Sequence, residues 1–346
     1  MPSSAVYSGV ESFSDNDELT EVTFAKGVTS IGDEAFRGCS SLAAITIPEG
    51  VTTIGERAFE GCSSLAAITI PDGVITIGHN AFLGCSSLAA ITIPDSVTKI
   101  SNATFWGCSS LAAITIPASM MTIGQGAFCR CSTLAAITIP DGVTLIGWAA
   151  FSRCSSLTAI TIPYGVTTIG PGTFQRCSSL TAITIPDGLT TIGKHAFNGC
   201  SSLTAITIPD GVTTIGDAAF QECSSLTAIT IPEGVTKIGE AAFRDCAALM
   251  KLSLSPAISV ESGAFVNCTA LIAAAADQNM STVEDLLHSR WHRILERVTV
   301  LSCLKTLFTD QKKRKRQDGG EAQTLGVTAV RKRLPKVMWR VILEFL

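Results

Sequence analysis

The sequence predicts a solenoid of the α/β class, in which short parallel strands and short helical turns repeat along one axis. Three observations predict it. A leucine recurs every 23 residues from Leu19 to Leu249, with one residue deleted before Leu271. Within each period the apolar residues first alternate as in a strand and then take a spacing typical of a helical turn. One period has too few apolar side chains to fold alone, so the eleven periods of residues 19–271 must stack around a shared core.

The first half of each period is predicted to be extended. In residues 203–225, LTAITIPDGVTTIGDAAFQECSS, Ile206 and Ile208 flank a threonine with a period of two, so the isoleucines point inward and the threonine outward. Pro209 ends this strand because it has no N–H for the ladder, and Pro-Asp-Gly favours a turn. The apolar spacing of three in residues 212–215 is compatible with a second strand or with a looser extended segment.

The second half of each period is predicted to be a short helical turn. Ala219, Phe220 and Cys223 have spacings of one and three, which place their side chains on one face of a helix. Two serines then lead into the next leucine. Because the phenylalanine recurs at the same place, we expect the rings of successive periods to form a column in the core.

The cysteines follow the period rather than a disulfide framework. Of the 13 cysteines, only Cys129 and Cys303 lie outside the repeat. One per period suits a small buried side chain, and the chain has no CxxC pair for zinc. The periodic cysteines, predicted to be free thiols, are Cys39, Cys62, Cys85, Cys108, Cys131, Cys154, Cys177, Cys200, Cys223, Cys246 and Cys268.

The pattern L-x-x-I-x-I-P-x-x-V-x-x-I-G-x-x-A-F-x-x-C-x-x-L, seen from Leu42 to Leu65, resembles the BspA-like leucine-rich repeats. The resemblance covers about residues 19–271. It implies a curved leucine-rich-repeat solenoid with a strand face and an outer face of short helical segments. It also implies the kind of role that family members often have, which is cell-surface adhesion or recognition.

The two ends of the solenoid need covers, because an exposed terminal strand invites edge-to-edge pairing. Residues 1–18 are predicted to be a degenerate N-terminal cap, and residues 272–308 an amphipathic helix that caps the other end or binds a partner. A basic flexible linker, 309–333, and an apolar helix, 334–346, follow. The last helix weakly resembles the first helix of an F-box.

Charge divides the chain into an acidic and a basic part. Residues 1–271 have 11 basic and 21 acidic side chains, net −10, and residues 272–346 have 14 and 8, net +6, which sum to −4. An unbroken basic run is a candidate nuclear-import signal or contact for an anionic partner such as nucleic acid, the alternative being plain solvation. The run comprises Lys312, Lys313, Arg314, Lys315 and Arg316.

The N-terminus lacks a basic start followed by an apolar stretch, and no window has the roughly 18 uninterrupted apolar residues of a membrane span. We therefore expect an intracellular protein, cytoplasmic or nuclear. No catalytic, cofactor-binding or metal-binding set is apparent. His288 and His292 share a helix face, but Ser289 stands where a zinc protease motif has glutamate.

A binding surface is expected where the repeat varies. The outward strand positions are almost all threonine, whereas the positions after the glycine and after the phenylalanine vary. There Leu83, Trp106 and Cys129 form a column, with Trp148 at the companion position one period on, and these four are the predicted partner-binding residues. The alternative is drift in a redundant repeat.

These observations predict a monomeric, non-enzymatic scaffold or recognition module for a protein partner. Three other functions stay open: an adhesin, an F-box-like adaptor, and a threonine array that orders water or adsorbs to a repetitive surface.

Overall fold

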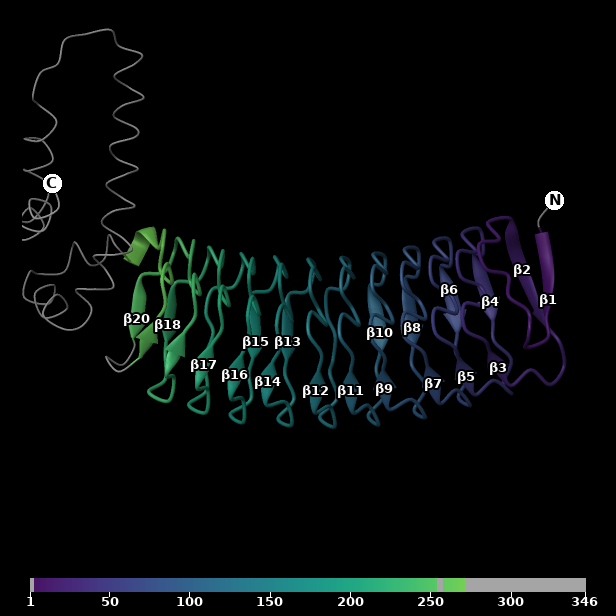
Figure 1. Ribbon diagram of the computed structural model, residues 1–346, viewed down its shortest axis with the longest axis horizontal. Helices are drawn as coiled ribbons and strands as arrows, with labels where there is room; N and C mark the ends of the chain where they lie inside the picture. Colours follow the sequence, from purple (N-terminus) through teal and green to yellow (C-terminus); the bar gives the residue numbers. More distant parts are fainter. Residues whose placement is uncertain (1–2, 254–257, 272–346) are drawn as a thin grey trace, which may run out of the picture. The chain divides into compact units, whose positions relative to one another are not determined.

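The computed structural model describes residues 3–253 and 258–271. The chain winds into a single row of stacked coils, most of which carry a strand in an upper column and a strand in a lower column (Figure 1). We number the coils from 1 to 11, each beginning at its leading leucine, so that coil 1 begins at Leu19 and coil 6 at Leu134. Every strand pairing is parallel and joins one coil to the next.

First strands pair in register in two-stranded sheets, which join coil 2 to coil 3, coil 4 to coil 5, coil 7 to coil 8 and coil 10 to coil 11. Thr46 lies beside Thr69, and Ile45 beside Ile68. Ile45 is buried while Thr46 is exposed, which confirms the predicted inward isoleucines and outward threonines. Coils 6 and 9 join this column through the single bridges of Ala136 and Ala205. Its strands are β2 (Leu19–Phe24), β4 (Ala44–Thr46), β6 (Ala67–Thr69), β8 (Ala90–Thr92), β10 (Ala113–Thr115), β13 (Ala159–Thr161), β15 (Ala182–Thr184), β18 (Ala228–Thr230) and β20 (Lys251–Ser253).

The segment after the Pro-Asp-Gly turn is a second strand of two residues. Its members are β3 (Ser30–Ile31), β5 (Thr53–Ile54), β7 (Thr76–Ile77), β9 (Lys99–Ile100), β11 (Thr122–Ile123), β12 (Leu145–Ile146), β14 (Thr168–Ile169), β16 (Thr191–Ile192), β17 (Thr214–Ile215), β19 (Lys237–Ile238) and β21 (Ser259–Val260). They form three sheets, β3-β5-β7, β9-β11-β12 and β14-β16-β17-β19-β21. The second sheet column is therefore interrupted between coils 3 and 4 and between coils 6 and 7.

The first interruption coincides with Ser101, which stands where most coils have glycine. These glycines lie against the preceding coil: a Cβ on Gly147 would be 2.4 Å from the backbone nitrogen of Gln125. The hydroxyl of Ser101 donates to the carbonyl oxygen of Ile77 in the preceding coil (2.7 Å). One coil earlier, the equivalent bond is made by the backbone, because the N–H of Gly78 donates to the carbonyl oxygen of Ile54 (2.9 Å). At Ser101 the side-chain hydroxyl thus takes the place of the backbone bond that glycine makes in other coils.

We expect Gly147→Ala to lower the free energy of unfolding by about 1–3 kcal/mol, because the added methyl group overpacks the contact between coils. Gly147→Ser should recover about 1 kcal/mol of that loss through its hydroxyl. Gly188→Ala is the matched control, since the nearest atom to its added Cβ is 3.6 Å away. Urea denaturation measures all three. Equal stability of the alanine and serine variants at 147 would contradict the explanation for Ser101.

The prediction of helical turns after the glycine is wrong. In coil 3, Asn80 and Gly84 have the left-handed φ values of 57° and 74°, which interrupt a right-handed helix. The N–H groups of Asn80, Phe82 and Gly84 donate to carbonyl oxygens of coil 4, and those of Leu83 and Cys85 donate three residues back. These donors are therefore unavailable for helical bonds. The segment consists of consecutive tight turns that extend the backbone ladder between coils.

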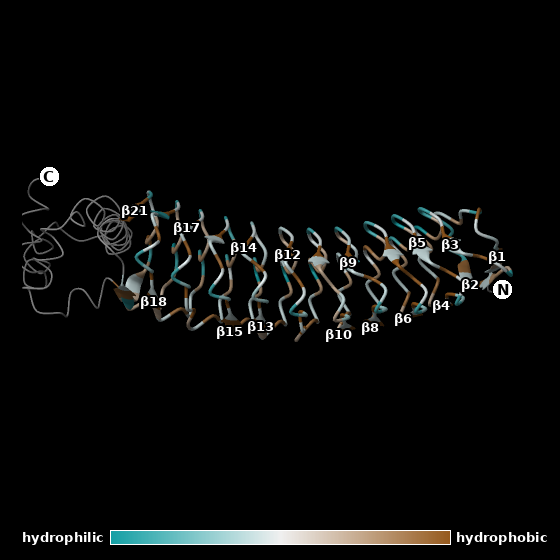
Figure 2. Ribbon diagram, turned by 90° about the horizontal axis from the view of Figure 1, so that it is seen from below, coloured by the Kyte–Doolittle hydropathy of each residue, from teal (hydrophilic) through white to brown (hydrophobic). Residues whose placement is uncertain are grey.

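The phenylalanines form a continuous stack through the core. From Phe36 to Phe265, ring centroids of neighbouring coils lie 5.2–5.6 Å apart, with interplanar angles of 1–12°. Columns of leucine, isoleucine, valine and cysteine are buried beside them. The same order of hydrophobic and hydrophilic residues recurs from coil to coil (Figure 2). One core therefore runs through all eleven coils.

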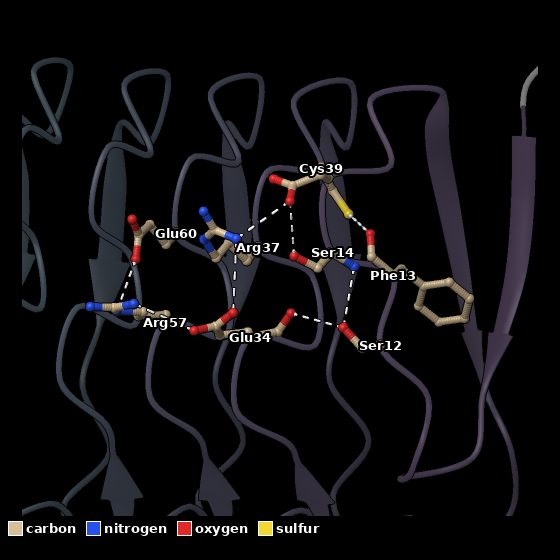
Figure 3. Close-up of polar contacts among 9 residues, drawn as sticks. Ser12, Phe13, Ser14, Glu34, Arg37, Cys39, Arg57 and Glu60 are labelled. Carbon is tan, nitrogen blue, oxygen red and sulfur yellow. Dashed lines mark hydrogen bonds and ion pairs between the residues drawn. The ribbon is translucent and has the colours of Figure 1, made fainter.

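Residues 3–18 form an incomplete coil against coil 1. Their strand β1 (Ser3–Tyr7) pairs with β2, and Phe13 stacks on Phe36 at 5.7 Å. Figure 3 shows the polar contacts here, in which Glu34 lies between Arg37 and Arg57 at 3.8 and 3.4 Å. These charged side chains are substantially exposed, so each pair contributes little to stability. The predicted cap, linker and final helix, 272–346, lie outside the described residues.

Candidate interaction surface

The cysteines of the solenoid are structural. Every described cysteine is buried and free. The thiol of each periodic cysteine donates to the carbonyl oxygen of a phenylalanine in the preceding coil, as Cys154 does to Phe128 (3.1 Å). Burial raises the pKa of the Cys39 thiol to about 11 and that of Cys200 to about 12. The reactive thiolate is therefore disfavoured.

Neither a metal site nor a membrane span is found in the part of the chain that the structure describes. No group of three or more His, Cys, Asp or Glu side chains there is arranged to hold a metal ion. None of its helices is long and apolar enough to cross a membrane. His288 and His292 lie outside this part of the chain, as does the basic run from Lys312 to Arg316.

The predicted column of Leu83, Trp106 and Cys129 occupies one backbone position in coils 3 to 5. The N–H of Gly84 donates to the carbonyl oxygen of Trp106 (2.7 Å), and that of Gly107 to Cys129 (2.8 Å). Leu83 and Trp106 are half-buried. Cys129 is only 3% exposed, so its interpretation as a surface residue is wrong.

Side chains at this position extend along the solenoid axis and pack against the following coil, and this direction explains the burial of Cys129. Its thiol interacts with Ser152 of coil 6, and burial raises its pKa despite that contact. The ring of Trp106 lies over Gly126 of coil 5, where a Cβ would be 2.8 Å from two ring carbons. A side chain at 126 would collide with the indole in this orientation, so this tryptophan and this glycine fit each other.

Trp148 is the most exposed of the four residues, at 60%. Its ring lies over Gly170, whose added Cβ would be 2.7 Å from ring carbon Cδ1. In other coils the residue at this position accepts a bond from the next coil, as Asn102 accepts from the N–H of Gln125 (2.9 Å). In the coil after Trp148, the residue equivalent to Gln125 is Pro171, which has no N–H. The tryptophan, which cannot accept such a bond, therefore leaves no backbone donor without a partner.

The second interruption of the lower sheet column falls between β12 and β14, at Trp148 and Pro171. Gly126 and Pro171 differ from the residues that most coils have at their positions, whereas Gly170 is the glycine of most coils. The two unusual residues favour a maintained surface over drift in the repeat.

The structure adds apolar residues that the sequence reasoning missed. Met121 and Leu145 are 57% and 55% exposed on the second strand column, where most coils have threonine. They lie in neighbouring coils, because Leu145 pairs with Thr122. Leu145 is also three residues before Trp148. Their signal in the sequence is the loss of threonine at an outward position.

A family model described as "BspA type Leucine rich repeat region (6 copies)" matches residues 6–133, 98–217 and 190–307. A leucine-rich repeat protein from Bacteroides ovatus is 28% identical, with a TM-score of 0.57 over 75% of this chain and 83% of that one. A leucine-rich repeat protein from Eubacterium ventriosum is 26% identical, with a TM-score of 0.50 over 73% of this chain and 84% of that one.

A leucine rich cell surface protein from Faecalibacterium prausnitzii is 33% identical over 71% of this chain and 83% of that one, with a TM-score of 0.44. The comparison with curated proteins found no similar sequence. The family model spans most of the coils, and the repeat that it describes is the one whose stacking the structure shows. The chain belongs to the BspA-type leucine-rich repeat family.

Proposed function

We propose that this solenoid is a non-enzymatic recognition module that binds a protein partner through its tryptophan edge, by which we mean Trp106, Met121, Leu145 and Trp148. The observation that carries the proposal is the exposed indole of Trp148, held in place over Gly170. Large, rigid aromatic side chains dominate the energetics of protein interfaces, and an ordered one loses little entropy on binding. Met121 and Leu145 extend the apolar area across two coils.

We expect Trp106→Ala and Trp148→Ala to abolish partner capture without lowering the thermal midpoint. The measurement is crosslinking mass spectrometry of the tagged full chain in its source cell, with a photoreactive residue at position 145. Tyr164→Ala is the matched control, because Tyr164 is 75% exposed but lies in the Pro-x-Gly turn of another coil. Unchanged crosslinks in both tryptophan variants would refute the tryptophan edge.

We place this function inside the cell, in the cytoplasm or nucleus. Display at a cell surface is the second candidate, favoured by the description of the Faecalibacterium prausnitzii relative. Fractionation of the source cell with surface proteolysis distinguishes the two. Deletion of Lys312 to Arg316 then tests whether the basic run directs nuclear import.

An ordered-water function is favoured by one observation, the in-register row of exposed threonines that includes Thr46 and Thr69. Such a row repeats a hydroxyl and a methyl group about every 4.8 Å. A freezing-hysteresis measurement tests this function directly, and Thr161→Lys in the middle of the row should abolish any hysteresis.

A further inference from the structure

Charge is segregated along the edge formed by the turns between glycine and cysteine. In coils 4 to 8 these segments, residues 102–107, 125–130, 148–153, 171–176 and 194–199, contain no aspartate or glutamate. The corresponding segment of coil 3, residues 79–84, contains none either, whereas the segments of coils 1, 2, 9 and 10 are acidic. Their carboxylates include Asp33, Glu34, Glu56, Glu60, Asp217, Glu222, Glu240 and Asp245. The middle of this edge is thus a basic island on a solenoid whose residues 1–271 carry a net charge of −10.

Lys194 in this island pairs with Asp217 of the next coil (3.4 Å). The other cations are three arginines, which we call the arginine row: Arg130, Arg153 and Arg176. They occupy the same backbone position in coils 5, 6 and 7, with left-handed φ values of 64°, 62° and 59°. Each donates its backbone N–H to the next coil, as Arg153 does to Gln175 (2.7 Å). The three side chains are exposed.

The arginine row differs from the arginines of the N-terminal coils in having no counter-charge. Arg37 and Arg57 each contact carboxylates of their own or adjacent coils at 3.4–3.8 Å. In the described ranges, the arginines of the row form no ion pair. Three like charges about 4.8 Å apart along the backbone repel one another, and an anionic ligand would relieve that repulsion.

The side chains next to the row can hydrogen-bond but carry no charge. They are Ser152, Gln175 and Asn198, each directly before the left-handed position of its coil. Trp148 is in the same turn as Arg153, five residues earlier. Ser152 and Asn198 are buried, so the exposed part of the row combines the guanidinium groups with the half-buried Gln175 amide and the ring of Trp148. A mixture of cationic, polar and aromatic groups is expected of a specific interface.

We propose that the arginine row binds an acidic segment of a partner protein, laid along the solenoid axis beside Trp148. This inference rests on the proposed function and states the chemistry of the partner. The guanidinium fork pairs with carboxylates in bidentate geometry. The coil spacing of about 4.8 Å is close to the 5–6 Å between helix positions i and i+3 or i+4, and shorter than the roughly 6.7 Å between side chains on one face of a strand. An acidic helix face matches the row best.

A long polyanion fits the surface less well. The row spans three coils, and acidic turn segments begin within two to three coils on either side. A nucleic acid or anionic polysaccharide running along the axis would meet those carboxylates, whereas a short acidic segment would not.

The test uses the full chain and two synthetic helical peptides, one with glutamates on one face and one with glutamines in their place. Fluorescence anisotropy should show binding of the glutamate peptide only, weakening as salt rises. Replacing all three arginines with glycine should weaken it by roughly tenfold or more, since each exposed pair is worth up to about a fivefold change. Glycine is the residue that five other coils have at this position, so these variants keep the fold.

A second variant with glutamine at Lys312 to Arg316 controls for the basic run and should bind as the wild type does. Equal affinity of the glycine and wild-type chains, loss of binding in the basic-run variant, or tighter binding of duplex DNA than of the peptide would each overturn the proposal. Alanine at Trp106 and Trp148 separates the two hypotheses. If peptide binding requires the arginines while partner capture is unchanged by the tryptophan substitutions, the arginine row is supported and the tryptophan edge is refuted.

Discussion

Raising the pH above 9 is expected to unfold the solenoid. Burial raises the pKa of all eleven periodic thiols above the ordinary value of 9.0. Below pH 9 the thiols are protonated in both the folded and the unfolded chain, and their contribution to stability is fully present. Above it, the unfolded chain loses protons that the folded chain keeps. Each thiol then lowers the free energy of unfolding by about 1.4 kcal/mol per pH unit.

A few thiols acting together reach the typical stability of a domain, about 5–15 kcal/mol. Circular dichroism against pH should therefore show a steep transition between pH 9 and 11 that reverses on rapid neutralisation under reducing conditions. Replacing Cys131, Cys154 and Cys177 with alanine should make the stability less dependent on pH, whatever it does at neutral pH. An unchanged pH dependence in that variant would show that other groups cause the transition.

Phe151→Ala is expected to lower the free energy of unfolding by about 3–5 kcal/mol. Phe151 is fully buried, and its ring lies 5.4 Å from that of Phe128 and 5.6 Å from that of Phe174. Truncation leaves a cavity in the middle of the stack that neighbouring rings cannot fill without tilting. Urea denaturation gives the total loss, and hydrogen exchange should locate it in coils 5 to 7.

Phe13→Ala is the control for position along the phenylalanine stack. Phe13 is half-buried and stacks on one ring only, so its replacement should have less than half the effect. Equal effects at 13 and 151 would mean that the stack contributes no more in the middle than at its end.

The period of 23 residues and the inward isoleucines allowed the strands, the parallel stacking and the phenylalanine column to be predicted. The turns were not predictable by the same reasoning. Ala219, Phe220 and Cys223 all face the core, as a helix would place them, but the preceding Ala218 has a φ of 51°. Alanine gives no signal for a left-handed backbone; the contact with the next coil imposes it.

The candidate surface was predictable only in part. The two tryptophans stand out in the sequence, but the burial of Cys129 depends on how its side chain meets Ser152 in the following coil. That direction follows from the left-handed turns, which the sequence does not reveal. The arginine row could be found by reading each repeat position down the coils and asking where charge changes sign.

The two gaps in the lower sheet column have a consequence for how the molecule comes apart. In a linear array, cohesion at each junction decides whether neighbours melt together or separately. The junctions after coils 3 and 6 lack the lower-column pairing found at the others, although the bridge of Ala136 with Ala159 still joins coils 6 and 7 in the upper column. Denaturation should therefore proceed in blocks with boundaries near Ser101 and Trp148. The middle block holds both tryptophans and two of the three arginines of the row, and the third lies just beyond its boundary. A ligand that binds both Arg153 and Arg176 would bridge the junction between coils 6 and 7. It should therefore raise the pulling force at which these two coils separate in a single-molecule experiment.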